Sequence, residues 1–598
     1  MLAPAAALPD IATEPRSMQP TLPTPCPAVC RSARRMMLLA AALWLAGCAS
    51  LPHDVERPVS TALSDAGSAS ALGRLAQAAA PSAEVSGFRL IPSGEAAYAT
   101  LLTLADRAER TLDLQYYIID SDSAVRELMR HVLVAAARGV RVRVLVDDLH
   151  SAGRDLAFLK FSSHRNVEVR LFNPFPGGRM SNLTRLLSAA AEFRRVNRRM
   201  HNKVFIADNA LAVTGGRNLG AEYFTQVQGT HFVDLDVLAA GLAVRQLSSA
   251  FDAYWNSAFA YPVEALAPEP GKAHPPEARE GNYPPPVVLP RPVASPQPIE
   301  VPTRPIDMDS GSGPQVSGGK IADSEPPPPR LRGPTDPARA APADTQLLRP
   351  GPHDWFLADQ LARNQLRLEW APAQVIVDRP AKVAGDPAEP ADERLARTLL
   401  HVVQEARREV ILISPYFVPG ERGVEVIRAL TARGVRLRVL TNSLAATDAP
   451  IVHVGYAKYR DALLRSGVEL DELRPVLGQR SRALGTFASS LASLHVKSVI
   501  VDRSTLFVGS MNIDPRSVGL NTESGLIIRS PVLAQAVAGL FDDTVRDSAY
   551  HVTEADGRLR WTTQENGREA VYDREPDVGT GRRLWIHLLA PFTPEELL

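Results

Sequence analysis

The chain has 598 residues, of which 45% are hydrophobic and 22% charged, and its 66 basic side chains are balanced by 66 acidic ones. This length and composition allow several domains with large cores and exclude a wholly disordered chain. The zero formal charge supplies no global field that would attract nucleic acid, so we expect no nucleic-acid partner.

The N-terminus is typical of an exported protein. A basic stretch, Arg31–Arg35, precedes the apolar run Met36–Leu45, and the sequence Leu45-Ala-Gly-Cys48 follows at once. The run is too short to span a membrane and fits the apolar part of a signal peptide. Leu-Ala-Gly-Cys resembles a bacterial lipobox, which implies cleavage before Cys48 and lipidation of its sulfur. A plain signal peptide with an incidental cysteine is the alternative.

We therefore expect residues 1–48 to be a lipoprotein signal peptide, and the mature chain to be held on a membrane by lipidated Cys48. The expected location is the bacterial cell envelope, facing the periplasm. Ala49 after the cysteine favours the outer over the inner membrane, by resemblance to enterobacterial lipoproteins. Cys26 and Cys30 lie in the removed segment, so the mature chain keeps no thiol for a disulfide or a metal.

Composition divides the rest of the chain. Residues 49–85 are rich in Ala, Ser and Pro and are predicted to be a tether, and residues 263–345 are so rich in Pro, Gly and Ser that we expect a disordered linker. The two remaining blocks, 86–262 and 346–555, are predicted lobes, followed by a C-terminal tail at 556–598.

The two blocks resemble each other. The segment Ala137–Leu145 reads almost as Ala432–Leu440 does, and each block shows a strand, a helix and a second strand. The ranges are 112–119, 123–138 and 140–147 in the first block and 410–416, 422–433 and 435–441 in the second. Such alternation predicts two homologous α/β lobes, each with a sheet flanked by helices.

One motif occurs in both blocks with unchanged spacing: His-x-Lys-x4-Asp-x6-Gly-(Gly/Ser)-x-Asn. Its members are His201, Lys203, Asp208, Gly215, Gly216 and Asn218 in the first copy, and His495, Lys497, Asp502, Gly509, Ser510 and Asn512 in the second. Strands at 203–207 and 497–501, turns, and return strands at 210–214 and 505–508 are predicted around it. Residues i and i+2 of a strand share a face, so His and Lys are expected to point into one pocket.

These residue types suit phosphodiester chemistry. One imidazole attacks phosphorus and forms a phosphohistidine, while the other acts as general acid. The lysines and asparagines hold the non-bridging oxygens, and the small residues at 215, 216, 509 and 510 let a phosphate approach the backbone. We expect neither a metal nor another cofactor.

Acidic residues have two predicted roles. Asp234 and Glu523 hold equivalent places in β-rich runs and are predicted to orient the histidines, with Asp236 as the less favoured alternative to Asp234. Either could instead be a solvated acid at a strand end. Asp208 and Asp502 sit on turns and are predicted to be structural. The arginines between Arg194 and Arg199 form either a platform for anionic head groups or a solvated basic segment.

The doubled motif resembles that of the phospholipase D superfamily, over about residues 88–262 and 346–555. Several segments look more narrowly like bacterial cardiolipin synthases: Leu171–Phe175, Asn197–Lys203, Gly215–Gly220, Asp234–Val237 and Ser414–Pro419. The resemblance implies two lobes in a pseudo-twofold arrangement with the active site between them. It also implies phosphatidyl transfer through a phosphohistidine, with His201 as nucleophile and His495 as acid.

The expected function is synthesis of cardiolipin from phosphatidylglycerol and a second phospholipid, either phosphatidylglycerol or phosphatidylethanolamine. A phospholipase D-type hydrolase or nuclease would use the same residues with water as acceptor, so the catalytic residues leave these alternatives open. A non-enzymatic envelope lipoprotein is the third hypothesis, which two intact motif copies disfavour.

Overall fold

The structure is a computed structural model that describes residues 51–65, 67–177, 179, 185, 192–224, 230–266, 357–385, 392–475, 491–565, 567–579 and 581. The predicted signal peptide with Cys48, nearly all of the predicted linker and the end of the tail lie outside these residues. Within them, no helix is both long enough and apolar enough to cross a membrane.

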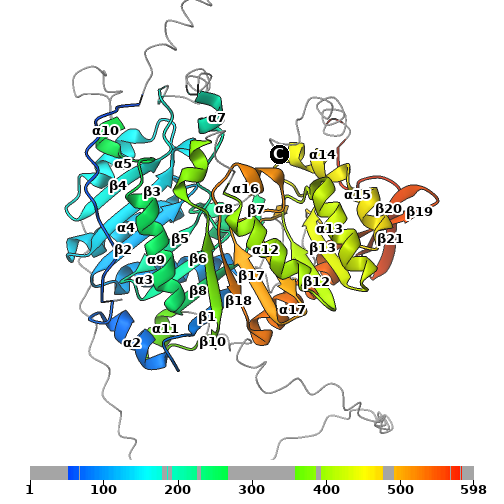
Figure 1. Cartoon of the computed structure of the whole chain (residues 1–598), viewed down its shortest axis with the longest axis horizontal. Coiled ribbons are helices and arrows are strands. Elements are labelled where there is room, and N and C mark those ends of the chain that lie inside the picture. Colours follow the sequence, from blue (N-terminus) through cyan, green and yellow to red (C-terminus); the bar gives the residue numbers. More distant parts are fainter. Residues whose placement is uncertain are drawn as a thin grey trace, which may run out of the picture. The chain divides into compact units, whose positions relative to one another are not determined.

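The first lobe is built on a nine-stranded sheet of order β10-β1-β8-β6-β5-β2-β3-β4-β9 (Figure 1). Its strands are β1 (Ser86–Ile91), β2 (Thr111–Tyr116), β3 (Arg141–Asp147), β4 (Val167–Phe172), β5 (Val204–Ala207), β6 (Leu211–Gly215), β8 (Asp236–Gly241), β9 (Ala260–Pro262) and β10 (Glu369–Ala371). Its helices are α2 (Ala71–Ala79), α3 (Gly94–Arg107), α4 (Ser123–Ala137), α5 (Asp155–Ser162), α7 (Phe193–Val196), α8 (Ala221–Phe224), α9 (Leu242–Trp255), α10 (Val263–Leu266) and α11 (Leu357–Ala362).

The second lobe is built on a ten-stranded sheet of order β11-β18-β17-β16-β12-β13-β14-β19-β20-β21. Its strands are β11 (Ala373–Val377), β12 (Glu409–Ile413), β13 (Arg436–Asn442), β14 (Glu469–Leu473), β16 (Ser498–Val501), β17 (Thr505–Gly509), β18 (Ser524–Ile528), β19 (Ala549–Ala555), β20 (Arg558–Glu565) and β21 (Arg568–Tyr572). Its helices are α12 (Arg394–Gln404), α13 (Gly420–Ala432), α14 (Pro450–Ala457), α15 (Arg460–Arg465), α16 (Pro515–Gly519) and α17 (Pro531–Ser548).

The two sheets share one topology, which confirms the prediction of homologous α/β lobes. Eight strands of the first sheet, from β1 to β9 in spatial order, correspond one by one to the eight from β11 to β19 in the second. In each lobe three parallel strands (β2-β3-β4 and β12-β13-β14) lie beside an antiparallel hairpin (β5-β6 and β16-β17). The predicted hairpins around the motif are therefore present.

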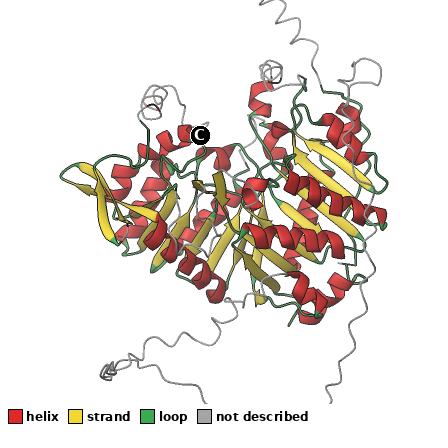
Figure 2. Cartoon of the chain, turned by 180° about the vertical axis from the view of Figure 1, so that it is seen from behind, coloured by secondary structure: helices red, strands yellow, loops and turns green. Residues whose placement is uncertain are grey.

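Alternating side chains divide each sheet into two buried faces. In the first lobe Leu112 and Leu114 of β2 face a core formed with α3 and α4, whereas Val204 and Ile206 of β5 face α9. The period of two along a strand produces this division, and Figure 2 shows the helices on either side of the strands. The α9 core continues without a break into the α17 side of the second sheet, so one hydrophobic cluster joins the lobes.

A short two-stranded sheet also joins the lobes. Strand β7 (Thr230–Val233) of the first lobe pairs in parallel with β15 (Leu491–Leu494) of the second. On the other side of the junction, Met200 forms a parallel bridge with Thr522. These two connections lead directly into the motif histidines.

Three expected boundaries differ from the structure. Helix α11 and strand β10 pack on the first lobe, so the second lobe begins at β11, not at residue 346. Arg558–Glu565 and Arg568–Tyr572, expected in the tail, form β20 and β21 and extend the second sheet. The segment expected to be a tether is attached to the first lobe: the amides of Ser60 and Ala62 donate to side chains near the end of α9, and Leu72 of α2 is buried. Composition missed these contacts because it does not record which backbone amides and apolar side chains meet distant parts of the chain.

Candidate active site

The two motif copies meet where the lobes join. His201 and Lys203 immediately precede β5, and His495 and Lys497 immediately precede β16. The four side chains are buried: the histidines are 7% and 6% exposed and the lysines 1% and 2%. The charges of Lys497 and His495 act on His201, so the structure brings together residues almost three hundred positions apart in one site.

Backbone hydrogen bonds across the junction fix each histidine. The amide of His201 donates to the carbonyl of Thr522 over 2.9 Å, and the amide of His495 donates to the carbonyl of Val233 over 2.7 Å. The residue that follows each of these carbonyls is a predicted orienting acid, Glu523 or Asp234. Each histidine is thus held beside the carboxylate of the opposite lobe.

The side chains repeat this crossed arrangement. Nδ1 of His495 lies 2.6 Å from Oδ2 of Asp234, and Nδ1 of His201 lies 3.0 Å from Oε2 of Glu523. An ionised carboxylate only accepts hydrogen bonds, so Nδ1 of each ring carries the proton and the Nε2 atom is left for chemistry. The spacing of Glu523 from His495 in the sequence did not reveal that the acids pair across the lobes.

Asp236 has a different partner. Its carboxylate forms an ion pair of 3.1 Å with Arg217, and both groups are buried. Asp234, not Asp236, reaches a histidine. The two acids, only two residues apart in sequence, therefore have different partners and different roles.

Lysine geometry is the same in both copies. Nζ of Lys203 donates to the carbonyl of His201 and Nζ of Lys497 donates to the carbonyl of His495, each over 2.6 Å. Each ammonium has three donors and uses one here. The asparagines are less completely bonded: the Oδ1 atoms of buried Asn218 and Asn512 have no hydrogen-bond partner among the described residues. These groups are available for polar contacts with a substrate.

The small residues after the return strands make room for the acids. A Cβ on Gly216 would lie 2.8 Å from Cγ of Asp234, so only glycine lets that carboxylate lie against the backbone. In the other copy Ser510 replaces this glycine, and its hydroxyl donates to Oε2 of Glu523 over 2.5 Å. Gly215 and Gly509 likewise face the neighbouring strand, β8 or β18, closely. The space beside these glycines is thus taken by the Asp234 carboxylate and the neighbouring strand, whereas the sequence suggested that it is left for the phosphate.

The motif aspartates lie away from the histidines, on the hairpin turns. Asp208 and Asn209 both have positive φ (54° and 52°), as do Asp502 and Arg503, a conformation typical of two-residue hairpin turns. The carboxylate of Asp208 accepts the amides of residues 109–111, and that of Asp502 accepts the amides of residues 407–409. Each acid therefore ties the hairpin to the start of the adjacent strand.

Three of the four arginines before His201 form contacts within the protein, where the sequence left open either a head-group platform or a solvated basic segment. Arg198 donates to carbonyls of Lys382 and Gly519, and buried Arg199 pairs with Asp147 at 3.3 Å. Arg195 binds Glu192. Arg194 is exposed.

Burial dominates the electrostatics of the site. It lowers the pKa of Lys203 to about 7 and that of Lys497 to about 8. Burial, with help from both lysines, holds the pKa of His201 well below its usual value, and burial with Lys497 also lowers the pKa of His495.

The pKa values of the two orienting acids, Glu523 and Asp234, shift in opposite directions. Burial raises the pKa of Glu523 to about 7 against the opposing charge of Lys203. For Asp234 burial is outweighed, first by the charge and hydrogen bond of His495, and its pKa is lowered.

Aromatic rings that no sequence motif distinguished lie beside both histidines. Tyr117 lies edge-on to His201 with ring centroids 5.0 Å apart, and Tyr223 lies edge-on to His495 at 5.3 Å. Phe232 packs on Tyr223 and His495, and the Tyr223 hydroxyl accepts a hydrogen bond from Asn218. Aromatics after a strand are common in cores, so only the fold distinguishes these. Among the described residues no group of three His, Cys, Asp or Glu side chains could hold a metal ion.

Paired histidines on doubled α/β lobes define a protein of the phospholipase D superfamily, as the repeated motif indicated. Residues 101–255 and 399–545 match the family described as "Cardiolipin synthase, PLD-like domain". Cardiolipin synthase C of Escherichia coli is 34% identical over 505 residues, covering 84% of this chain and 94% of that protein. The chain therefore belongs to the cardiolipin synthase family.

Two further similarities were found. An uncharacterized Helicobacter pylori protein is 28% identical over 80% of this chain and 82% of its own length. The crystal structure of a phosphatidylserine synthase from Haemophilus influenzae covers 86% of this chain and 95% of its own, with a TM-score of 0.49 and 13% identity.

Proposed function

We propose that this protein is a phosphatidyltransferase that makes cardiolipin from phosphatidylglycerol and a second phospholipid, phosphatidylglycerol or phosphatidylethanolamine. The observation that carries the proposal is the crossed pairing of each histidine with the carboxylate of the other lobe. This pairing leaves both Nε2 atoms for a nucleophile and an acid. The family to which the chain belongs supports the choice of substrate class.

His201 is the proposed nucleophile. Its lowered pKa leaves the ring neutral with a free Nε2 lone pair, and Glu523 holds the proton on Nδ1. Attack forms the Nε2–phosphorus bond and breaks the bond between phosphorus and the head-group oxygen. Lys203, Lys497, Asn218 and Asn512 stabilise the charge on the non-bridging oxygens.

His495 is the proposed acid. Burial and Lys497 lower the pKa of His495, whereas the ionised Asp234 at 2.6 Å opposes them and stabilises the imidazolium, which gives its proton to the leaving oxygen. The neutral His495 then takes a proton from the hydroxyl of the acceptor phosphatidylglycerol. That oxygen attacks phosphorus, the bond to His201 breaks, and cardiolipin leaves.

Water in place of the lipid hydroxyl would give phosphatidic acid, the product of a hydrolase. A nuclease would be expected to offer a basic groove, but arginines beside His201 are used internally. We further propose that lipidated Cys48 holds the protein on an envelope membrane facing the periplasm, where both substrates are lipids of the bilayer.

Trapping the covalent intermediate tests the mechanism. Purified protein is mixed with phosphatidylglycerol or phosphatidylethanolamine labelled at phosphorus, quenched in base, digested and analysed for a labelled peptide. We expect label on the peptide with His201, none in His201→Ala, and accumulation in His495→Ala given a donor with a good leaving group. Label on His495 instead would reverse the two roles, and release of glycerol or ethanolamine identifies the donor.

A further inference from the structure

A third buried lysine lies close to the site but outside the repeated motif. Five lysines fall among the described residues, and three of them are buried: Lys203, Lys497 and Lys382. Nζ of Lys382 donates to Oδ2 of Asp378 over 2.8 Å and to the carbonyl of Ser517 over 3.2 Å. A buried ion pair is expensive to desolvate and adds little net stability, so its presence calls for another explanation.

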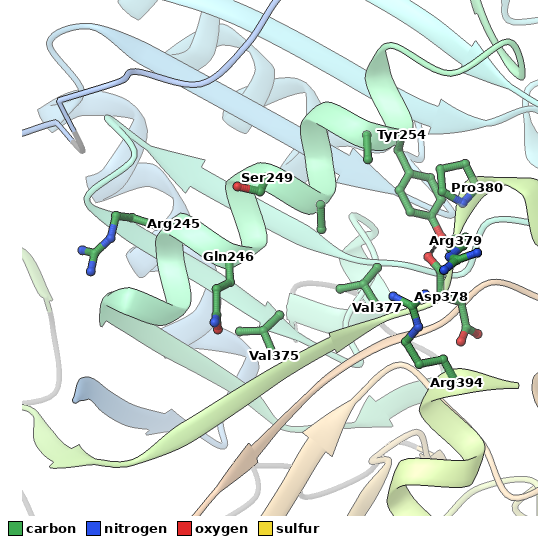
Figure 3. A pocket seen from close by; sticks show the side chains of 12 residues that line it. Arg245, Gln246, Ser249, Tyr254, Val375, Val377, Asp378, Arg379, Pro380 and Arg394 are labelled. Carbon is green, nitrogen blue, oxygen red and sulfur yellow. Dashed lines mark hydrogen bonds between the residues drawn. The ribbon is translucent and has the colours of Figure 1, made fainter. Parts of the chain in front are cut away.

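Asp378 forms hydrogen bonds to both the backbone amide and the backbone carbonyl of Glu523. Its Oδ2 atom accepts the amide of Glu523 at 3.2 Å, and its own amide donates to the carbonyl of Glu523 over 3.0 Å. Its Oδ1 atom accepts the amide of Leu395, and its carbonyl accepts the hydroxyl of Tyr254 at 2.8 Å. Figure 3 shows Tyr254 and Asp378 together at one end of a cavity of about 410 Å³, with Arg379 and Arg394 beside them.

The first lobe holds its acid differently. There Arg217 donates to the carbonyl of Asp234 over 2.5 Å and forms the ion pair with Asp236. The strand registers place Met511 at the position of Arg217 and Gly525 at the position of Asp236. The second lobe therefore lacks both members of this pair, and Asp378 with Lys382 occupies the corresponding place behind Glu523.

We propose that Asp378 and Lys382 are positioning residues that fix Glu523 and, through it, the orientation of His201. This inference rests on the proposed function for the role of His201, but the geometry of the contact does not depend on which lipid is the substrate. Neither residue touches His201 directly.

The pair also sets the charge balance at Glu523. Burial raises the pKa of Glu523 to about 7, and the positive charges of Lys203 and Lys382 oppose that rise. Burial raises the pKa of Asp378 to about 6, and the negative charge of Glu523 adds to that rise. The ionisable groups that act on Glu523 come from several elements: His201, Lys203, Lys497, Tyr117, Tyr254, Asp378, Lys382 and Asp514.

Removing the positive charge and removing the negative charge should therefore shift the pKa of Glu523 in opposite directions. Lys382→Met removes a positive charge and should raise the pKa of Glu523, whereas Asp378→Asn removes a negative charge and should lower it. The double variant removes both charges and Lys382→Arg keeps the positive one. Lys458→Met, at an exposed lysine, is the matched control.

The experiment measures head-group release from phosphatidylglycerol by the full chain between pH 5 and 9, with thermal unfolding of each variant. We expect kcat to fall about 10- to 100-fold with little change in KM, because a small misplacement of a reacting group has effects of this size. The acid limb should move to higher pH in Lys382→Met and to lower pH in Asp378→Asn. Lys382→Arg should restore part of the rate.

NMR titration of the His201 ring in histidine-labelled protein, with His201→Gln for assignment, measures without turnover how each variant shifts the ionisation of Glu523 beside the ring. A wild type that releases head groups but makes no cardiolipin would refute only the proposed acceptor. Folded variants with wild-type kcat and pH profile, or shifts of the same sign, would overturn the positioning role. So would failure of all the variants, the double one included, to fold, since that would assign the pair to stability alone.

Discussion

Replacing Asp234 with asparagine removes the negative charge that faces His495. Asparagine has nearly the same shape, so Oδ1 can still accept the amide of Leu235, as it does in the wild type. The amide group that replaces Oδ2 cannot accept from Nδ1 of His495. The imidazolium form therefore loses its partner, and the ring is no longer held as a proton donor at Nε2.

The size of the effect follows from the separation of the charges. The 2.6 Å between Nδ1 and Oδ2 places the two charge centres about 4 Å apart, where an ion pair is worth about 4 kcal/mol at an effective dielectric constant of about 20. The dipole of the asparagine amide retains part of this interaction energy. We expect transfer to slow about 100- to 1,000-fold, since each 1.4 kcal/mol corresponds to about a factor of ten.

The assay compares two donors. Phosphatidylglycerol needs its leaving oxygen protonated, whereas a phosphatidyl ester of p-nitrophenol does not. We expect Asp234→Asn to lose most of its activity on the first, and less than about tenfold in burst release of p-nitrophenol from the second. Asp113→Asn is the control, because it also removes a buried carboxylate but one that pairs with Arg143. Equal losses with both donors would refute the assignment of His495 as the acid.

Three further predictions concern pH, stability and packing. The value of kcat/KM should rise as Glu523 ionises near pH 7 and fall as the acid His495, whose pKa is lowered, and then Lys203 lose their protons, giving a narrow bell at or just below neutral pH; a flat profile from pH 5 to 9 would contradict this. Asp208→Ala leaves three backbone amides without their acceptor and should lower the stability by about 3 kcal/mol or more in urea unfolding, while Asp208→Asn should lose less. Gly216→Ala should displace the Asp234 carboxylate and reduce kcat at least about tenfold, whereas Gly539→Ala, where a Cβ meets nothing within 4 Å, should not; equal rates in the two would refute the steric role.

The local parts of the fold could be predicted from the sequence. The hairpins at 203–214 and 497–508 begin and end within a residue or two of the expected positions. Their apolar strands and the two-residue turns at Asp208 and Asp502 depend only on residues that are close together in the sequence. The doubling of the lobes was also visible, since two copies of one pattern require the same sheet topology.

Relations between distant segments could not be predicted in this way. The pairing of His201 with Glu523 and of His495 with Asp234 depends on the parallel contacts at Met200–Thr522 and β7–β15, which leave no periodic signal. The position of β10 on the first sheet has the same cause. Asp378 was missed because it belongs to no repeated motif and acts through the backbone of another residue.

Product analysis on lipid vesicles tests the central claim most directly. Purified protein is incubated with mixed phosphatidylglycerol and phosphatidylethanolamine vesicles, beside His201→Ala and His495→Ala, and the lipids are separated by mass spectrometry. We expect cardiolipin from the wild type and none from either variant. Phosphatidic acid without cardiolipin, or cardiolipin still formed by the variants, would contradict a transferase with one site shared by the two lobes.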